Sequence, residues 1–193
     1  TLGLPEMGTK LSRDVLMEAQ PKNFADLLQI EGLTHGTGVW LGNADELIKN
    51  GICDISKVIG CRDNIMNDLI AYGVEKSHAF KIMESVRKGK GLTPEWEEEM
   101  VAAGVPDWYI GSCKKIKYLF PKAHAVAYVM MAFRIAWFKV NYPLAFYAAY
   151  FYRRSQKGGF DAVLMTQGLE ASIANIEAID NNENSTDKDE DML

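Results

Sequence analysis

Cysteine is scarce in this 193-residue sequence, which has only Cys53, Cys61 and Cys113. Their number is odd and no two of them form a CxxC pair, so neither a disulfide framework nor a cysteine zinc site is indicated. This cysteine usage fits a reducing, cytoplasmic setting. A signal peptide is also absent and the first residue is Thr1 rather than methionine, which leads us to expect a segment cut from a longer chain.

Long uninterrupted hydrophobic runs are absent as well. The most apolar stretch, residues 125–151, is broken by Arg134, Lys139 and Pro143. It therefore falls short of the ~18 uninterrupted apolar residues that a membrane-spanning helix requires. We predict no membrane segment and interpret the stretch as a helix of a soluble core.

The residue patterns that usually carry catalysis are missing too. The sequence has no glycine-rich P-loop, no pair of carboxylates in an apolar setting and no His/Cys cluster, and its three histidines stand apart at positions 35, 78 and 124. Acid–base catalysis and metal binding need such groups close together. We therefore predict no catalytic residue and no metal ligand within this chain.

Acidic residues outnumber basic ones, but the two signs are unevenly distributed. The formal net charge is −5, of which residues 181–193 contribute −4, whereas residues 107–142 carry +5. A concentrated basic stretch attracts an anionic partner whatever the total charge is. The polar, acidic tail 181–193 lacks the apolar residues needed to offset the entropy of ordering, so we predict that it is disordered.

What the sequence does contain is helical periodicity. Its hydrophobic content of 48% suits a globular fold with a sizeable core, and apolar residues recur at helical rather than strand spacing. We predict an all-α fold of eight to ten helices, with Ala79, Ile82, Met83 and Val86 as the buried stripe of one of them. The predicted helices cover residues 11–19, 23–33, 44–50, 65–73, 75–88, 106–119, 143–154 and 160–179, and two more begin at residues 94 and 122.

Residues 106–143 are the centre of the functional prediction. The pattern predicts a helix from Pro106 to Leu119, a break at Pro121 and a second helix beginning at Lys122. The start of a helix carries unpaired N–H groups and a positive dipole end. With four lysines nearby, this break predicts an anion site, and phosphate is the obvious anion. The lysines are Lys114, Lys115, Lys117 and Lys122.

The same stretch resembles a known family. FPKAHAVAY at 120–128 and WFKVNYP at 137–143 are similar to the fingers motif of the C-family bacterial replicative DNA polymerases, the α subunits of DNA polymerase III. GLTHGTGVWLGNA at 32–44, VIGCRD at 58–63 and KIMESVRKGKGLTPE at 81–95 narrow the resemblance to the PolC type of Gram-positive bacteria. It covers roughly residues 1–154. We therefore divide the chain into a helical fingers domain (1–154), a C-terminal helix with its connector (155–180) and a disordered acidic tail (181–193).

This resemblance implies the fingers region of an enzyme that adds deoxynucleotides to a primer 3′ end. Two Mg²⁺ ions would be held by palm aspartates that lie outside this chain. The segment alone should therefore be inactive. The implied partners are primer-template DNA, the incoming dNTP, the palm and thumb of the same polymerase, and a sliding clamp bound through regions outside this chain; no membrane is implied.

Candidate binding residues follow from the basic stretches, the helix start and the resemblance. Arg87 and Lys88 could equally be helix-capping charges, and the turn at Thr34–Gly38 could be a simple interhelical turn. The expected nucleotide-binding residues are Lys122, His124, Tyr128, Lys114, Lys115, Lys117, Arg62 and Arg87. The expected DNA-binding residues are Lys88, Lys90, Thr34, His35 and Gly36. In the helix that starts at Lys122, we expect Phe133 and Trp137 to be core residues.

Two other function classes remain open from the sequence. One is a stand-alone helical DNA-binding module, which would bind duplex through phosphate charge without a nucleotide site. The other is a purely structural helical domain whose lysines are solvated.

Overall fold

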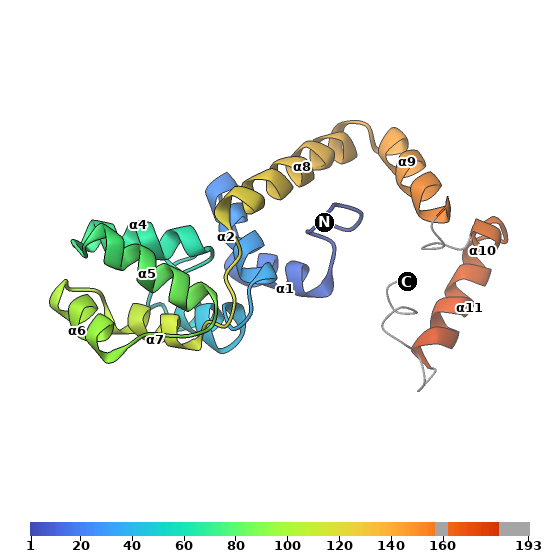
Figure 1. The fold of residues 1–193 in the computed structure, drawn as a ribbon. Coiled ribbons are helices and arrows are strands. Elements are labelled where there is room, and N and C mark those ends of the chain that lie inside the picture. Colours follow the sequence, from blue (N-terminus) through green and yellow to red (C-terminus); the bar gives the residue numbers. More distant parts are fainter. Residues whose placement is uncertain (157–161, 182–193) are drawn as a thin grey trace. The chain divides into compact units, whose positions relative to one another are not determined.

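The computed structural model describes residues 1–156 and 162–181 (Figure 1), and every named element in these residues is a helix. Within them there is no strand, only two isolated β-bridges, so the predicted all-α class is confirmed. The predictions of a loop at 156–159 and of disorder in the tail fall mostly on residues outside the described ones.

The chain divides into two compact units, Thr1–Ala136 and Trp137–Leu193. This boundary lies within a helix and differs from the boundary at 154, which stays a prediction. Unit 1 contains α1 (Lys10–Ala19), α2 (Phe24–His35), η1 (Trp40–Ala44), α3 (Asp45–Lys49), α4 (Arg62–Tyr72), α5 (Lys76–Arg87), α6 (Pro94–Ala102), α7 (Asp107–Lys115) and the first part of α8 (Lys122–Asn141). Unit 2 contains the end of α8, α9 (Pro143–Gln156), α10 (Ala162–Thr166) and α11 (Leu169–Asp180).

Side-chain caps fix where several helices of unit 1 begin. The Asn23 side chain accepts a hydrogen bond from the N–H of Asp26 at the start of α2. Thr93 accepts one from Trp96 at the start of α6, where Pro94 occupies the first helical position. Such caps satisfy N–H groups that a helix start leaves unpaired.

The main hydrophobic core lies in unit 1, between α2, α4, α5 and α7. The stripe predicted for α5 is confirmed, since Ala79, Ile82, Met83 and Val86 are all buried there. Ile30 of α2 and Ile65 of α4 have no exposed surface and join the same cluster. The core therefore holds the ends of these helices in fixed positions.

Residues 116–121, here called the junction segment, differ from the sequence prediction. The helix predicted to run from Pro106 to Leu119 ends at Lys115, and Ile116 is already extended. Ile116 remains buried in the core with Tyr109 and Cys113, the residues whose helical spacing suggested that the helix continued. Backbone hydrogen bonds to three distant parts of the chain replace the last helical turn.

Helix α8 begins at Lys122 as predicted, but it is not buried. Only Ala125, Val129 and Ala132 are buried, against the start of the chain and α2, while Phe133 is 56% and Trp137 51% exposed. The prediction that both aromatics are core residues is therefore wrong. The helix is apolar nearly all round, so its sequence could not indicate which face is covered.

By length and composition, α8 meets the criterion for a membrane span. It has 20 residues, a mean hydropathy of 1.2, and only 17% of its most apolar stretch is buried. Length and composition alone are weak evidence for a span, and Arg134 lies within the helix.

Unit 2 carries a row of aromatic side chains on α9. Phe146 is nearly buried, but Tyr147, Phe151 and Tyr152 are exposed, so the interpretation of this row as core is wrong for most of its members. The helix predicted for residues 160–179 is interrupted at Gly168, which has a φ of 97° and separates α10 from α11.

Candidate functional site

The junction segment brings together four stretches that the sequence marked separately. The carbonyl of Thr37 accepts hydrogen bonds from the N–H groups of Lys117 (2.8 Å) and Tyr118 (3.2 Å), and the Tyr118 carbonyl accepts one from Thr37 (3.0 Å). The Leu119 N–H donates to the Arg87 carbonyl (3.3 Å) at the end of α5.

The far end of the segment binds the start of α4, because the Arg62 N–H donates to the Phe120 carbonyl (3.1 Å). The ends of α2 and α5 and the starts of α4 and α8 therefore meet along a single extended segment leading from α7 to α8 (Figure 1).

At two positions, the backbone comes so close to residues 115–117 that only glycine fits. Gly89 has a φ of 70°, and a Cβ built on it would lie 2.6 Å from the Lys117 carbonyl oxygen. Gly38 has a φ of 69°, and its Cβ would collide with the Lys115 carbonyl oxygen. Any other residue at these sites would be strained in its backbone and would push the junction segment away.

Lys114 and Lys115 do not point to the start of α8. Lys114 forms an ion pair with Glu97 of α6, with Nζ 2.7 Å from Oε2. Lys115 pairs with Glu46 of α3 (3.2 Å) and donates to the Gly42 carbonyl (2.6 Å). These two lysines are thus engaged on other parts of the surface.

Arg87 and Lys88 share one acid. Arg87 donates two hydrogen bonds to Glu84, and Lys88 lies 3.0 Å from the same carboxylate. Hydrogen bonds from Arg87 and then from Lys88 lower the pKa of Glu84 to about 2. The side chains of Arg87 and Lys88 are thus held on the Glu84 carboxylate, and both their helix-capping role and their phosphate-binding role stay predictions.

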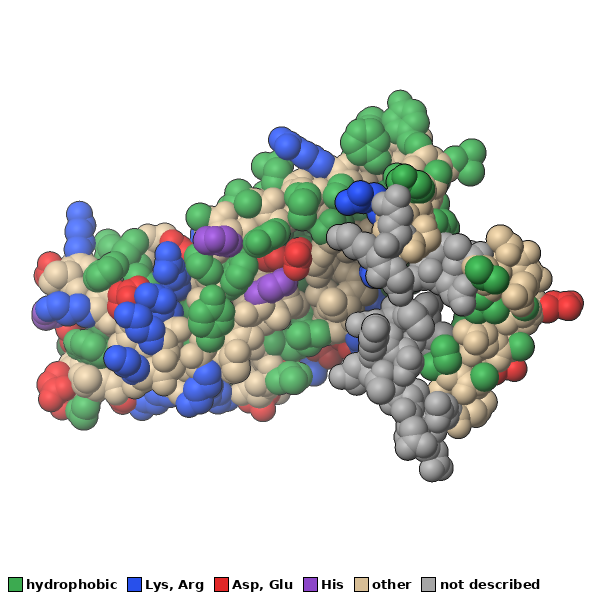
Figure 2. Space-filling view, turned by 45° about the vertical axis from the view of Figure 1, so that its right-hand side comes forward, with side chains coloured by type: hydrophobic (Ala, Val, Ile, Leu, Met, Phe, Trp, Pro, Cys, Tyr) green, Lys and Arg blue, Asp and Glu red, His purple; other side chains and the backbone are tan. Residues whose placement is uncertain are grey.

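Arg62, Lys117, Lys122 and Lys90 have no ion pair with any described residue. The first three are attached to the junction segment or to its immediate neighbours. Figure 2 shows Lys and Arg side chains gathered on one part of unit 1, beside hydrophobic and histidine side chains. An anion approaching the junction thus meets cations whose charge is not neutralised.

The start of α8 has a partner that the sequence did not reveal. The Asp63 carboxylate, from the first turn of α4, accepts a hydrogen bond of 2.8 Å from the Lys122 N–H. Pro121 has no N–H, and no described residue accepts from the N–H groups of Ala123 and His124. Two N–H groups and the Lys122 ammonium therefore remain for an anion.

An aromatic group stands beside this helix start. The ring of Phe120 lies 5.1 Å from that of His35, 6.0 Å from that of His124 and 6.4 Å from that of Tyr128, measured between ring centroids. His124 and Tyr128 are exposed. The structure thus brings together two predicted nucleotide-binding residues and one predicted DNA-binding residue.

In the turn after α2, the polar groups form hydrogen bonds to the backbone of α2 itself. The Thr34 hydroxyl donates to the Ile30 carbonyl (3.0 Å), the Gly36 N–H to the Gly32 carbonyl (2.9 Å), and His35 Nδ1 contacts the Glu31 carbonyl (2.9 Å). With Thr37 bonded to the junction segment, the arrangement is that of an interhelical turn. A DNA-binding role of Thr34, His35 and Gly36 stays a prediction.

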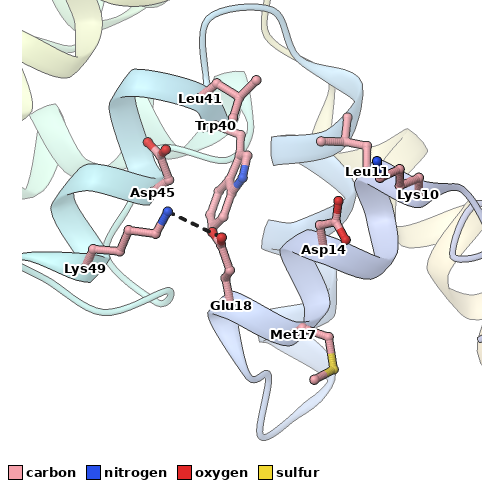
Figure 3. A pocket seen from close by; sticks show the side chains of 9 residues that line it. All are labelled: Lys10, Leu11, Asp14, Met17, Glu18, Trp40, Leu41, Asp45 and Lys49. Carbon is pink, nitrogen blue, oxygen red and sulfur yellow. Dashed lines mark ion pairs between the residues drawn. The ribbon is translucent and has the colours of Figure 1, made fainter.

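Two surface hollows lie in unit 1. The larger, about 520 Å³, lies between α1 and the η1–α3 region (Figure 3), where Lys49 pairs with Glu18 at 3.3 Å. A second hollow of about 360 Å³, lined from α5, α6 and the loop between them, contains Phe80 and Trp96 together with Lys88, Lys90 and the acid Glu84. The second therefore combines aromatic rings with the two lysines expected to bind DNA.

Comparison with known proteins places the chain in a family. A family model described as "Bacterial DNA polymerase III alpha subunit finger domain" matches residues 1–106, more than half of the chain. Over 179 residues the chain is 62% identical to the DNA polymerase III PolC-type of Bacillus subtilis, covering 93% of this chain and 12% of that protein. It is 58% identical over 194 residues to the protein of that name from Listeria monocytogenes, covering 100% of this chain and 13% of that protein.

The junction segment and α8 lie beyond the matched family region, but the alignment with the Listeria protein includes them. The chain spans about an eighth of the length of the curated relatives it matches.

Proposed function

The chain belongs to the finger-domain family of the bacterial DNA polymerase III α subunit, and we propose that it is the fingers segment of a PolC-type DNA-directed DNA polymerase. In that enzyme it binds the triphosphate of the incoming dNTP and positions the primer-template for nucleotidyl transfer in chromosome replication. The chemistry itself takes place outside this chain, in the cytoplasm.

The observation that carries this proposal is the convergence at the junction segment. The N–H groups of Ala123 and His124 lie in the first turn of α8, where no described residue accepts from them, and Lys122 at the first position of the helix is exposed. Phosphoryl transfer depends mainly on positioning the triphosphate and stabilising its charge, which N–H groups and cations held in place can do. Arg62 and Lys117 supply further positive charge from the two neighbouring segments.

The aromatic group next to the helix start suits the rest of the nucleotide. The exposed rings of His124 and Tyr128 flank Phe120 within one turn of the phosphate-binding N–H groups. Aromatic rings stack on bases and sugars whatever the base is. We therefore assign the sugar or base of the dNTP to this side.

The hollow on α5 suits DNA. Phe80, which is 52% exposed, and Trp96 offer ring faces, and Lys90, which has no ion pair with a described residue, offers charge for phosphates, whereas Lys88 is paired with Glu84. Ring faces combined with cations are typical of sites that bind a nucleic-acid strand. We assign this hollow to the template-primer.

Mg²⁺ is expected to act in the whole enzyme, but the carboxylates near the junction do not fit such a site. Asp63 already caps the start of α8 through the Lys122 N–H, and no described acidic group pairs with it there. The proposal therefore places the Mg²⁺ ligands outside this chain.

The exposed apolar side of α8 suits contact with the rest of the polymerase. Phe133 and Trp137 expose large apolar side chains, and an exposed apolar surface of this kind commonly marks a contact with another protein region. About seven-eighths of the relatives' length lies outside this chain and could supply that region. We propose that palm and thumb regions cover this side, while the sliding clamp is bound elsewhere.

Tyr128→Phe in the full-length polymerase should raise the KM for dNTP about two- to tenfold, the effect of losing one hydroxyl hydrogen bond of about 0.5–1.5 kcal/mol. Because Tyr128 is exposed, the melting temperature should stay unchanged. The control is Tyr72→Phe at the exposed end of α4. An unchanged KM in both variants would remove the Tyr128 hydroxyl from the nucleotide site.

Lys90→Ala should weaken primer-template binding by the full-length polymerase and reduce the slope of log Kobs against log salt concentration by about 1, because one phosphate contact is lost. The KM for dNTP should not change. Lys49→Ala, which removes a lysine paired with Glu18 in the other hollow, is the matched control. Equal slopes in wild type, Lys90→Ala and Lys49→Ala would refute the assignment of this hollow to DNA.

A further inference from the structure

Three potential metal ligands meet at the end of α2. Glu6 comes from the segment before α1, and Glu31 and His35 lie one helical turn apart on α2. His35 Nε2 is 2.9 Å from Glu6 Oε2, His35 Nδ1 is 3.6 Å from Glu31 Oε1, and one donor atom from each residue lies within 4.8 Å of the other two.

The Glu31 carboxylate is the unusual member. Its side chain is only 1% exposed, and neither of its oxygen atoms has a hydrogen-bond partner in the described structure. Burial without a donor penalises a charged carboxylate heavily. Burial accordingly raises the pKa of Glu31 to about 7, although His35 lowers it and Glu6 raises it further. The carboxylate faces the other two ligands, so a cation between them would satisfy it.

We propose that Glu6, Glu31 and His35 form a binding site for a divalent transition-metal ion of the Zn²⁺ type. Two carboxylate oxygens and one imidazole nitrogen are a donor set that such ions accept, with a fourth position open to water. Mg²⁺ is a poorer match because it prefers oxygen ligands and keeps several waters. The two carboxylates neutralise the charge of the ion.

The environment of His35 supports this assignment. Its Nδ1 lies 2.9 Å from the Glu31 carbonyl oxygen and can donate to it, which leaves Nε2 for the ion. A bond from the second ring nitrogen to a carbonyl orients the histidine ligand in many metal sites. Side chains of Glu6 and His35 are each 30% exposed, so an ion can enter from solvent. Ligand atoms in a tetrahedral site with bonds near 2.0 Å are about 3.3 Å apart, and the donor atoms of this cluster already lie within 4.8 Å of one another.

Metal binding would tie the start of the chain to the end of α2. It would also hold His35 against Phe120, whose ring contacts His124 and Tyr128. The site is thus structural, and it does not depend on the proposed binding of a nucleotide.

The test is titration of the untagged 193-residue chain with Zn²⁺ by calorimetry, and with Co²⁺ by visible absorption. Cys53 is replaced by serine in every sample because it is the one partly exposed cysteine among the described residues. The variants are Glu31→Gln, Glu6→Gln and His35→Gln. Glu31→Gln keeps the side-chain volume without the buried charge, and Glu6→Gln lies at a part-exposed position, so both should fold. His78→Gln is the control, since His78 pairs with Glu99 (3.0 Å) elsewhere on the surface.

We expect one Zn²⁺ per chain, a rise in melting temperature with Zn²⁺, and a tenfold or greater loss of affinity in each cluster variant but not in His78→Gln. Affinity should fall as the pH is lowered, because a metal ligand must be deprotonated to bind the ion. Absence of binding in the Cys53→Ser parent, or binding that persists in both Glu31→Gln and His35→Gln, would overturn the proposal.

Discussion

Lys122→Ala in the full-length polymerase is expected to raise the KM for dNTP and lower the rate of incorporation, together reducing kcat/KM about tenfold to a hundredfold. The reason is that the substitution removes a charge-assisted contact of roughly 1.5–3 kcal/mol at the start of α8. Lys122 is exposed and has no ion pair among the described residues, so its removal leaves no buried charge behind. Steady-state primer extension at varied dNTP concentration measures the effect.

Lys114→Ala is the matched control for this experiment. Both lysines belong to the basic stretch found in the sequence, but Lys114 pairs with Glu97 on α6. Its removal should therefore leave the dNTP dependence at the wild-type value. Primer-template affinity should stay nearly intact in both variants. If Lys122→Ala and Lys114→Ala behave alike, charge in this stretch acts only through the overall field and not through a phosphate site.

The contrast between these lysines shows what the sequence could predict of the site. Helix boundaries around Pro121 follow from local rules, since proline disfavours a helical conformation in the residue before it, and α8 does begin at Lys122. The partners of Lys114 and Lys115, by contrast, come from α6 and α3, more than fifteen residues away in the chain. Local patterns do not contain such contacts.

The error at residues 116–119 has the same origin. Ile116 continues the helical spacing of Tyr109 and Cys113 and is indeed buried, but the backbone bonds to Thr37, Arg87 and Arg62 stabilise an extended conformation instead. Periodicity indicates which residues are buried, whereas hydrogen bonds between residues far apart in the sequence determine the backbone conformation. For α5, whose bonds are local, the same reasoning predicted both the helix and its buried face.

Two features near the site were not predicted from the sequence, although His35 itself was expected to bind DNA. Asp63 lies in the first turn of α4, where an acidic side chain usually stabilises the N-terminus of its own helix. Here it caps the N-terminus of α8 instead. Glu31 and His35 are four residues apart on a helix, a spacing that does place two side chains on one face and could have been noticed. Glu6 could not have been added to them, because it lies in an irregular segment.

A second large effect is expected from Gly32→Ala, which should lower the free energy of unfolding of this chain by about 3 kcal/mol, the upper part of the usual range for overpacking. A Cβ on Gly32 would collide with the Gly60 carbonyl oxygen, and it would lie 2.6 Å from the Gly60 carbonyl carbon and 2.7 Å from Cys61 Sγ. Backbone atoms cannot rotate away as a flexible side chain can. A shift of Gly60 and Cys61 would also affect the site, because the next two residues contact it: Arg62 binds the junction segment and Asp63 caps α8.

Gly111→Ala is the control for this prediction, and it should change stability in the opposite direction. Gly111 lies inside α7, and its added Cβ would meet nothing within 4 Å. Alanine in a helix interior is favoured over glycine by roughly 0.5–1 kcal/mol because the unfolded chain loses less entropy on folding. Urea unfolding of the two variants and wild type measures both changes. A Gly32→Ala chain as stable as wild type would mean that α2 and residues 60–61 can separate at little cost, and that their close contact does not fix the start of α4.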